Sequence, residues 1–247
     1  MYLKYRRKID EKIASKVVKR ISHTNITPNQ ISTIGLLFAA FAAVFFSFGW
    51  YPFSVIASIL FILARFCDHL DGKLAIAKGE STKLGHYLDY FVGTVSYILM
   101  FLGISAGIPD KIFGYIGGYS VENFLTLSAI FACLFNTLLH FLYKARFEKE
   151  FYDYPSTKDV DLEDGIYLIG PFAWFGLINI FFFISTITAS TASCLSGSAE
   201  NIIAISGRPL SVTSLSKLIA WMTWSMRFSL KIVLKVINTI FERHFDF

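Results

Sequence analysis

Three aspartates with helical spacing are the residues of this chain best suited to chemistry. Asp68 and Asp71 are three residues apart, and Asp89 lies within the next apolar stretch. Residues three or four apart share one face of a helix, and carboxylates at membrane depth are costly and usually functional. Hard oxygen ligands suit Mg²⁺ or Mn²⁺, which characteristically bridge to substrate phosphates. The spacing therefore predicts a divalent metal site for phosphate chemistry, with these three aspartates as ligands.

Small residues accompany the acids on both expected helices. Gly72 and Ala75 extend the face that begins at Asp68, while Gly85 and Gly93 stand four residues before and after Asp89. Each face thus combines carboxylates with little side-chain bulk. Packing the two faces together is expected to place three carboxylates around one point. The alternative for any one acid is an ordinary solvated helix end.

The composition indicates a polytopic membrane protein. Of 247 residues, 54% are hydrophobic, only 17% are charged, and 26 are Phe, which excludes an ordinary soluble domain. Three cysteines give neither a disulfide framework nor a CxxC metal motif. The net charge of +5 is modest and unevenly placed, so we expect it to bear on topology and lipid headgroups, with no nucleic-acid partner.

Residues 1–25 are expected to form an amphipathic juxtamembrane helix. Basic residues are frequent there, and Ile9, Ile13, Val17 and Ile21 recur every four residues. Such a helix suits the surface of an anionic membrane. The alternative is a solvated N-terminal helix.

The remaining chain, residues 26–240, is expected to form a six-transmembrane-helix bundle, which makes the fold an all-α integral membrane protein with a single domain over 1–247. Thr27 and Pro28 suit the start of the first span. Residues 191–214 are predicted to be a loop, and the last span has an interfacial helix as its alternative. The expected spans, each long enough to cross the hydrocarbon core, are 31–50, 51–77, 84–107, 124–143, 166–190 and 215–240.

Lysine and arginine predict the orientation. The turns near residues 50 and 110 have almost no basic residues, whereas the N-terminal segment and two later loops are basic. The positive-inside rule then puts both termini and the carboxylate site on the cytoplasmic side. The basic loop residues are Lys73, Lys78, Lys83, Lys144, Arg146, Lys149 and Lys158.

The carboxylate pattern resembles the signature of the CDP-alcohol phosphotransferase family. That signature reads D-x-x-D-G-x-x-A-R, eight residues, then G-x-x-x-D-x-x-x-D. The segment Ile26–Ser32, ITPNQIS, also looks like the entry to the family's first span. Six signature positions agree, namely Asp68, Asp71, Gly72, Ala75, Gly85 and Asp89.

The resemblance implies a reaction. The family transfers a phosphoalcohol group, here expected to be phosphatidyl from CDP-diacylglycerol, to an acceptor hydroxyl and releases CMP in phospholipid synthesis. Two metal ions, Mg²⁺ or Mn²⁺, commonly bridge the donor's diphosphate. By the same resemblance Asn29, Gly72, Ala75 and Gly85 are expected to contact the nucleotide donor, and the chain is expected to form a homodimer. The acceptor alcohol stays open.

Two signature positions differ from the family pattern. Ile76 replaces the Arg, and Gly93 replaces the fourth Asp, which is a ligand of the second metal and the proposed general base. Glycine can do neither job, and a positioned base is typically worth about 10²–10⁴-fold in rate. His86 is a candidate substitute base, since it lies three residues before Asp89. Its alternative is a capping or interfacial role.

A second polar group is a candidate pocket for a phosphorylated acceptor. It consists of His140, Lys144, Arg146 and Arg227. The alternatives are positive-inside flanking for the first three and contact with lipid phosphates for Arg227. Arg65 stands three residues before Asp68, where it can either pair with that carboxylate or extend to the interface.

Two other functions stay open on the sequence. One is a catalytically impaired family member that binds a CDP-alcohol or a partner protein. The other is a small cation-coupled transporter, although transporters often carry repeated halves and broken helices at the midplane, which this sequence does not suggest.

Overall fold

The computed structural model describes residues 2–79, 83–108, 114–116, 119–147 and 166–196. The chain divides into two compact units. Unit 1 contains Met1–Pro109 and Tyr154–Ser185, and unit 2 contains Asp110–Asp153 and Thr186–Phe247.

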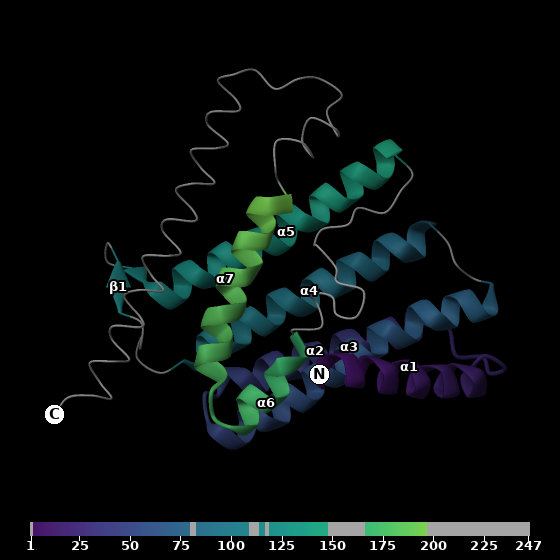
Figure 1. The fold of residues 1–247 in the computed structure, drawn as a ribbon, viewed down its shortest axis with the longest axis horizontal. Helices are drawn as coiled ribbons and strands as arrows, with labels where there is room; N and C mark the ends of the chain where they lie inside the picture. The colour runs from purple at the N-terminus through teal and green to yellow at the C-terminus, as the bar shows by residue number, and fades with distance from the viewer. Residues whose placement is uncertain (1, 80–82, 109–113, 117–118, 148–165, 197–247) are drawn as a thin grey trace. The chain divides into compact units, whose positions relative to one another are not determined.

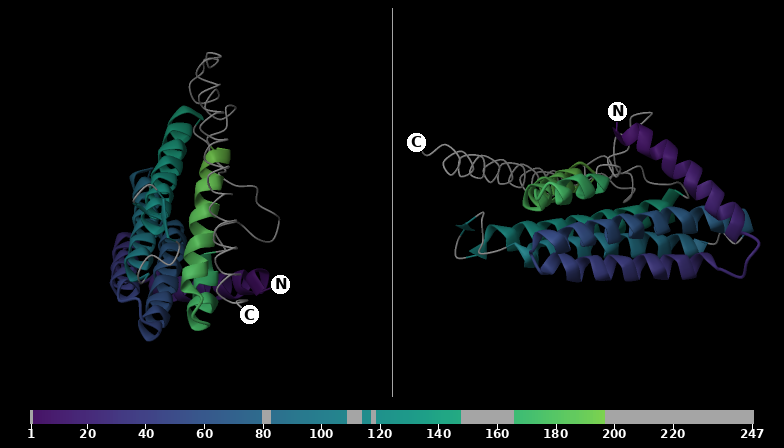
Figure 2. Two further views of the ribbon diagram at one scale, coloured as in Figure 1. Left: turned by 90° about the vertical axis from the view of Figure 1, so that its left-hand side faces the viewer. Right: turned by 90° about the horizontal axis from the view of Figure 1, so that it is seen from below.

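Unit 1 is a helical bundle in which α2 packs against both α3 and α4 (Figure 1). The helix α1 packs on α3, and Figure 2 shows it leaving the layer formed by α2, α3 and α4 at an angle. The short α6 also packs on α3, where the Tyr51 hydroxyl donates to the Trp174 carbonyl at 2.6 Å. The helices are α1 (Tyr2–Ile21), α2 (Pro28–Ser47), α3 (Tyr51–Lys78), α4 (Lys83–Gly107), α6 (Ile169–Trp174) and the first part of α7 (Ile178–Ser196).

Capping residues define the start of α2 and the end of α3. Thr27 and Gln30 form a reciprocal capping box at the start of α2, with Pro28 in its first turn. A left-handed glycine ends α3, because Gly79 has φ 68° and donates its N–H back into the last turn. The predicted start at Thr27 and the continuation of the second span past Asp71 are therefore confirmed.

The helix α1 is held on α3 by a small apolar cluster. Its buried members are Ala14, Val18, Ile31, Leu70 and Leu74. The predicted apolar stripe is only partly right, because Ile13 is 46% exposed while the neighbouring Ala14 is fully buried. The ammonium group of Lys78 also donates to the carbonyls of Thr24 and Ile26, at 2.7 and 2.8 Å, which fastens the α1–α2 connection to the end of α3. A location of α1 at the membrane surface stays a prediction.

Glycines allow α4 to approach α2 closely. A Cβ atom on Gly103 would lie 2.5 Å from the Ala43 carbonyl oxygen, and one on Gly107 would lie 2.0 Å from the Phe46 oxygen. Both obstacles are backbone atoms, so neither can move away as a flexible side chain can. Small residues at such crossings are typical of membrane helix pairs, where van der Waals packing drives association.

We expect Gly103→Ala to destabilise the protein by about 1–3 kcal/mol, because the added methyl group overlaps the α2 backbone. The measurement is the thermal unfolding midpoint of the purified chain in detergent. Gly72→Ala is the matched control, since a Cβ there meets nothing within 4 Å. That control should gain up to about 1 kcal/mol from helix propensity. Equal midpoints for the two variants would contradict the close crossing.

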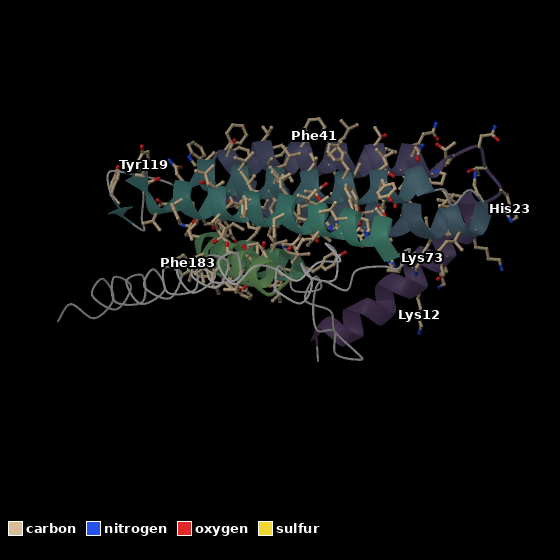
Figure 3. All side chains as sticks on the ribbon, turned by 90° about the horizontal axis from the view of Figure 1, so that it is seen from above. Lys12, His23, Phe41, Lys73, Tyr119 and Phe183 are labelled. Atoms are coloured by element: carbon tan, nitrogen blue, oxygen red, sulfur yellow. The ribbon has the colours of Figure 1, made fainter. Side chains whose placement is uncertain are left out.

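Four described helical segments are long and apolar enough to cross a membrane. They are Pro28–Ser47, Tyr51–Lys78, Tyr87–Gly107 and Val121–Leu142. Large apolar side chains cover their outward faces. Phe41 of α2, for example, is 55% exposed and points outward (Figure 3). The same view shows that Lys12, His23 and Lys73 lie toward one end of unit 1. A soluble monomer rarely exposes so much apolar surface, whereas lipid chains would cover it. The predicted sixth span, 215–240, lies outside the described residues.

The predicted continuous fifth span over 166–190 is wrong. Within it α6 ends at Trp174, and α7 begins at Ile178. Gly176 lies between them with φ 73°, and the Leu177 N–H donates to the Phe172 carbonyl at 2.7 Å, so the chain turns sharply there. The apolar part of α7, Ile178–Thr191, is shorter than the four candidate spans. Residues 191–196, predicted as the start of a loop, belong to α7.

Unit 2 contains a small β-hairpin, the helix α5 (Val121–Phe147) and the later part of α7. The hairpin pairs β1 (Tyr115–Ile116) with β2 (Tyr119–Ser120) in antiparallel register. The Ser128 and Ser190 hydroxyls lie 2.9 Å apart and join α5 to this part of α7.

Candidate active site

Asp71 is the most buried of the three aspartates and is tied to the start of α2. Its side chain is 4% exposed. The Ser32 hydroxyl of α2 donates a hydrogen bond to Asp71 Oδ2. The Gly72 N–H makes a weaker polar contact with the carboxylate, while Asp71 Oδ1 is buried without a partner of hydrogen-bond geometry in the described part of the chain. One oxygen is thus positioned by α2, and the other is buried without a hydrogen bond in the described part of the chain.

Asp68 forms an ion pair within α3. Arg65 Nη2 lies 3.0 Å from Asp68 Oδ2, with side chains 12% and 22% exposed respectively. The guanidinium also lies over the Tyr97 ring of α4, with Arg65 Cζ 4.8 Å from the ring centroid. Of the two alternatives that the sequence left for Arg65, pairing with Asp68 is confirmed.

Gly93 of α4 faces this ion pair. A Cβ atom built on Gly93 would lie 3.5 Å from Arg65 Nη1 and 3.8 Å from Asp68 Oδ1. Asp89 stands one helical turn earlier on α4, and the carboxylates of Asp89 and Asp68 both repel that of Asp71. The two predicted faces therefore do meet, and the signature position of the missing carboxylate lies beside Arg65.

These residues suit a divalent ion in kind and charge. Two of the three carboxylates repel the third, Asp71, whose Oδ1 is buried without a hydrogen-bond donor in the described residues. Carboxylate oxygens of this kind are the hard, negative ligands that Mg²⁺ or Mn²⁺ prefers. As the side chains lie, however, no three His, Cys, Asp or Glu side chains in the described ranges are grouped closely enough to hold a metal. Arg65 and Ser32 instead take up oxygens of Asp68 and Asp71.

The residues expected near the nucleotide lie in the first turns of α2 and α4 and toward the end of α3. Asn29 is exposed in the first turn of α2. Gly72 is exposed, with open space where a Cβ would lie, and Ala75 and Gly85 are half-buried. Ile76, at the position of the signature Arg, is 75% exposed. The side chain of His86 lies outside the described part.

The predicted acceptor pocket is described only in part. His140 lies in α5 of unit 2 and is fully buried, with its ring edge-on to Phe141 at 6.2 Å between centroids. Lys144 and Arg146 follow in the same helix, but their side chains are outside the description, as is all of Arg227. The geometry therefore places His140 inside a packed unit and leaves the pocket a prediction.

Two residues of the site carried no predicted role. Ser32 lies within the ITPNQIS segment. The only feature of the sequence that could have drawn attention to it is a polar hydroxyl four residues after the start of an apolar helix. Tyr97 lies four residues after Gly93, so it shares the face that contains Asp89. Neither signal identifies a partner, because the contacts depend on how α2, α3 and α4 pack.

Four helical segments of membrane-spanning length and apolar composition define an integral membrane protein. Residues 25–150, just over half of the chain, match the CDP-alcohol phosphatidyltransferase family. The chain belongs to this family, whose members generally use divalent metal ions.

A relative with an assigned activity supports this membership. The chain is 32% identical over 107 residues to the archaetidylinositol phosphate synthase of Pyrococcus horikoshii. The matched region covers 43% of this chain and 55% of that protein, so the chain spans about half the length of its relative. Phospholipid synthesis is the process to which both comparisons point.

Proposed function

We propose that this protein is a membrane phosphotransferase that moves a phosphatidyl group from a CDP-alcohol to an acceptor hydroxyl and releases CMP. The observation that carries the proposal is the meeting of two signature faces. Asp68 and Asp71 on α3 lie opposite the Asp89–Gly93 face of α4, and Ser32 at the entry of α2 bonds to Asp71.

In this proposal Asp68, Asp71 and Asp89 hold a divalent ion, Mg²⁺ or Mn²⁺. When bound, such an ion neutralises charge that develops on the leaving CMP. Ser32 fixes the orientation of Asp71. The open surface at Gly72, continued by Ala75 and Gly85, lets a nucleotide approach the helices, and the exposed Asn29 is placed to bond its polar groups. His86 is the nearest candidate in sequence to take the acceptor proton, which Gly93 cannot do.

The proposed donor is CDP-diacylglycerol. For the acceptor, the name of the relative concerns archaetidylinositol phosphate, which makes inositol phosphate the first alcohol to test. A phosphorylated acceptor needs cations, and His140, Lys144, Arg146 and Arg227 are the proposed source.

The proposed topology keeps the single domain 1–247 and six crossings, with α7 as the fifth and residues 215–240 as the sixth. Residues 1–25 lie on the membrane surface, and both termini and the carboxylates face the cytoplasm. Lys12, His23 and Lys73 at one end of unit 1 support this orientation (Figure 3). The proposed assembly is a homodimer.

A second candidate is a family member that binds CDP-alcohols with little turnover. The specific observation in its favour is Gly93, which supplies neither a ligand nor a base at the fourth signature position. CDP binding without CMP release would distinguish this candidate from the transferase.

The test is CMP release by the purified chain in lipid nanodiscs. CDP-diacylglycerol and an archaeal ether-lipid CDP donor are each combined with inositol phosphate, glycerol phosphate, serine and inositol, with Mg²⁺ or Mn²⁺. We expect release that depends on both metal and acceptor, with the highest rate for a phosphorylated acceptor. Retained CDP binding with no release for any pair would contradict the transferase and support the second candidate.

A further inference from the structure

Arg65 lies where a fourth carboxylate and its metal ion would need space. Its guanidinium is held by Asp68 at 3.0 Å and by the Tyr97 ring, and its Nη1 stands 3.5 Å from the position of a Cβ on residue 93. A Cβ itself would fit at ordinary contact distance. A longer acidic side chain would extend directly against the guanidinium, so Gly93 and Arg65 are matched in space.

The formal charge of the site also fits one divalent ion better than two. Four signature carboxylates carry a formal charge that two divalent ions neutralise. Here three carboxylates and the always-charged guanidinium of Arg65 leave a formal charge of −2. One divalent ion neutralises that charge. A second ion would have to bind beside a fixed cation and without the fourth ligand.

We propose that the Arg65 guanidinium takes the place of the second metal ion, so that this carboxylate site holds one divalent ion per chain. The inference rests on the proposed function of the same site. Arginine can serve in this way because its planar guanidinium carries a permanent charge and pairs well with phosphate and carboxylate oxygens. Asp68 and Tyr97 hold the guanidinium in one orientation. The positive charge of Arg65 is therefore fixed in the site, whereas a metal ion stays there only while its ligands bind it.

The experiment counts bound Mn²⁺ on the full-length chain in nanodiscs, by titration with detection of free Mn²⁺ by electron paramagnetic resonance. The wild-type chain is expected to bind one ion. Gly93→Asp is also expected to bind one, because the new carboxylate pairs with Arg65. The double variant Gly93→Asp, Arg65→Gln is expected to bind two. Lys73→Gln, which removes another cation from α3, is the matched control and should still bind one.

Three outcomes would overturn the inference: two ions on the wild type, none on the wild type, or two ions on Gly93→Asp alone. The last would mean that the missing ligand, and not Arg65, sets the number. A fourth is one ion on a folded double variant, because Arg65 would then not be what excludes the second ion. Where the double variant does not fold, the wild-type and Gly93→Asp counts can still overturn the inference. CMP release is measured on the same samples. If the wild type binds one ion and releases no CMP, the transferase is rejected and the inference is kept. If the wild type binds two ions and releases CMP, the transferase is kept and the inference is rejected.

Discussion

Asp71→Asn is expected to reduce CMP release by at least about 100-fold while the protein stays folded. Asp71 has the buried oxygen that lacks a hydrogen-bond partner in the described part of the chain, so it is the carboxylate best prepared for a cation. Replacing it with an amide removes the charge that holds the ion, and loss of one such electrostatic contribution typically costs about 10²–10³-fold in rate. Asparagine keeps nearly the same shape and can still accept from Ser32.

The measurement is the initial rate of CMP release at saturating Mn²⁺, with the thermal midpoint recorded for each variant. Glu122→Gln is the matched control, because it makes the same acid-to-amide change at a residue of α5 that is 3% exposed and has no proposed role in the site. Equal rates for wild type and Asp71→Asn would remove Asp71 from the catalytic site. An equal fall in both variants would assign the effect to lost charge or stability in general.

Asp68 is expected to behave differently, because the structure shows which of its two alternatives Arg65 adopts. Its carboxylate is already paired with Arg65, so part of its charge is neutralised before any ion binds. The sequence predicted three equivalent ligands from their spacing. Packing makes them unequal, because Ser32 reaches Asp71 from α2, whereas Arg65 reaches Asp68 from one turn earlier on α3.

The long helices could be predicted because their ends have local chemical signals. Thr27, Pro28 and Gly79 act through the backbone of their own turn, so the sequence contains the relevant information. The break at Gly176 could not be predicted in the same way. An apolar run with one glycine is compatible with a continuous helix, and the turn is stabilised by the hydrogen bond from Leu177 to Phe172.

The sequence predicted which site residues share a helix face, but it did not predict which side chains contact one another across the helices. Helical spacing put Asp68 with Asp71 and Asp89 with Gly93, and those groupings are what the structure has. The position of Arg65 opposite Gly93 depends on the register between α3 and α4, which no spacing within one helix specifies. For the same reason the apolar stripe of α1 was expected at Ile13, although Ala14 is the buried residue.

The largest gain in rate is expected from the double variant Gly93→Asp, Arg65→Gln, at about 10²-fold or more over the wild type. It restores a carboxylate at the fourth signature position and removes the cation that would neutralise it. The new side chain can then accept the acceptor's proton, which is typically worth about 10²–10⁴-fold. Gly93→Asp alone is expected to gain much less, because its carboxylate would lie against Arg65.

The assay is CMP release under single-turnover conditions for the wild type, both single variants and the double variant, so that slow product release does not mask the chemical step. Arg65→Gln alone should be slower than the wild type, because the site then loses a cation and gains no base. This opposite response of Arg65→Gln in the two backgrounds is the decisive observation, since simple destabilisation would slow both. If the wild type is already fast and the double variant gives no gain, position 93 does not limit catalysis, and another group takes the proton.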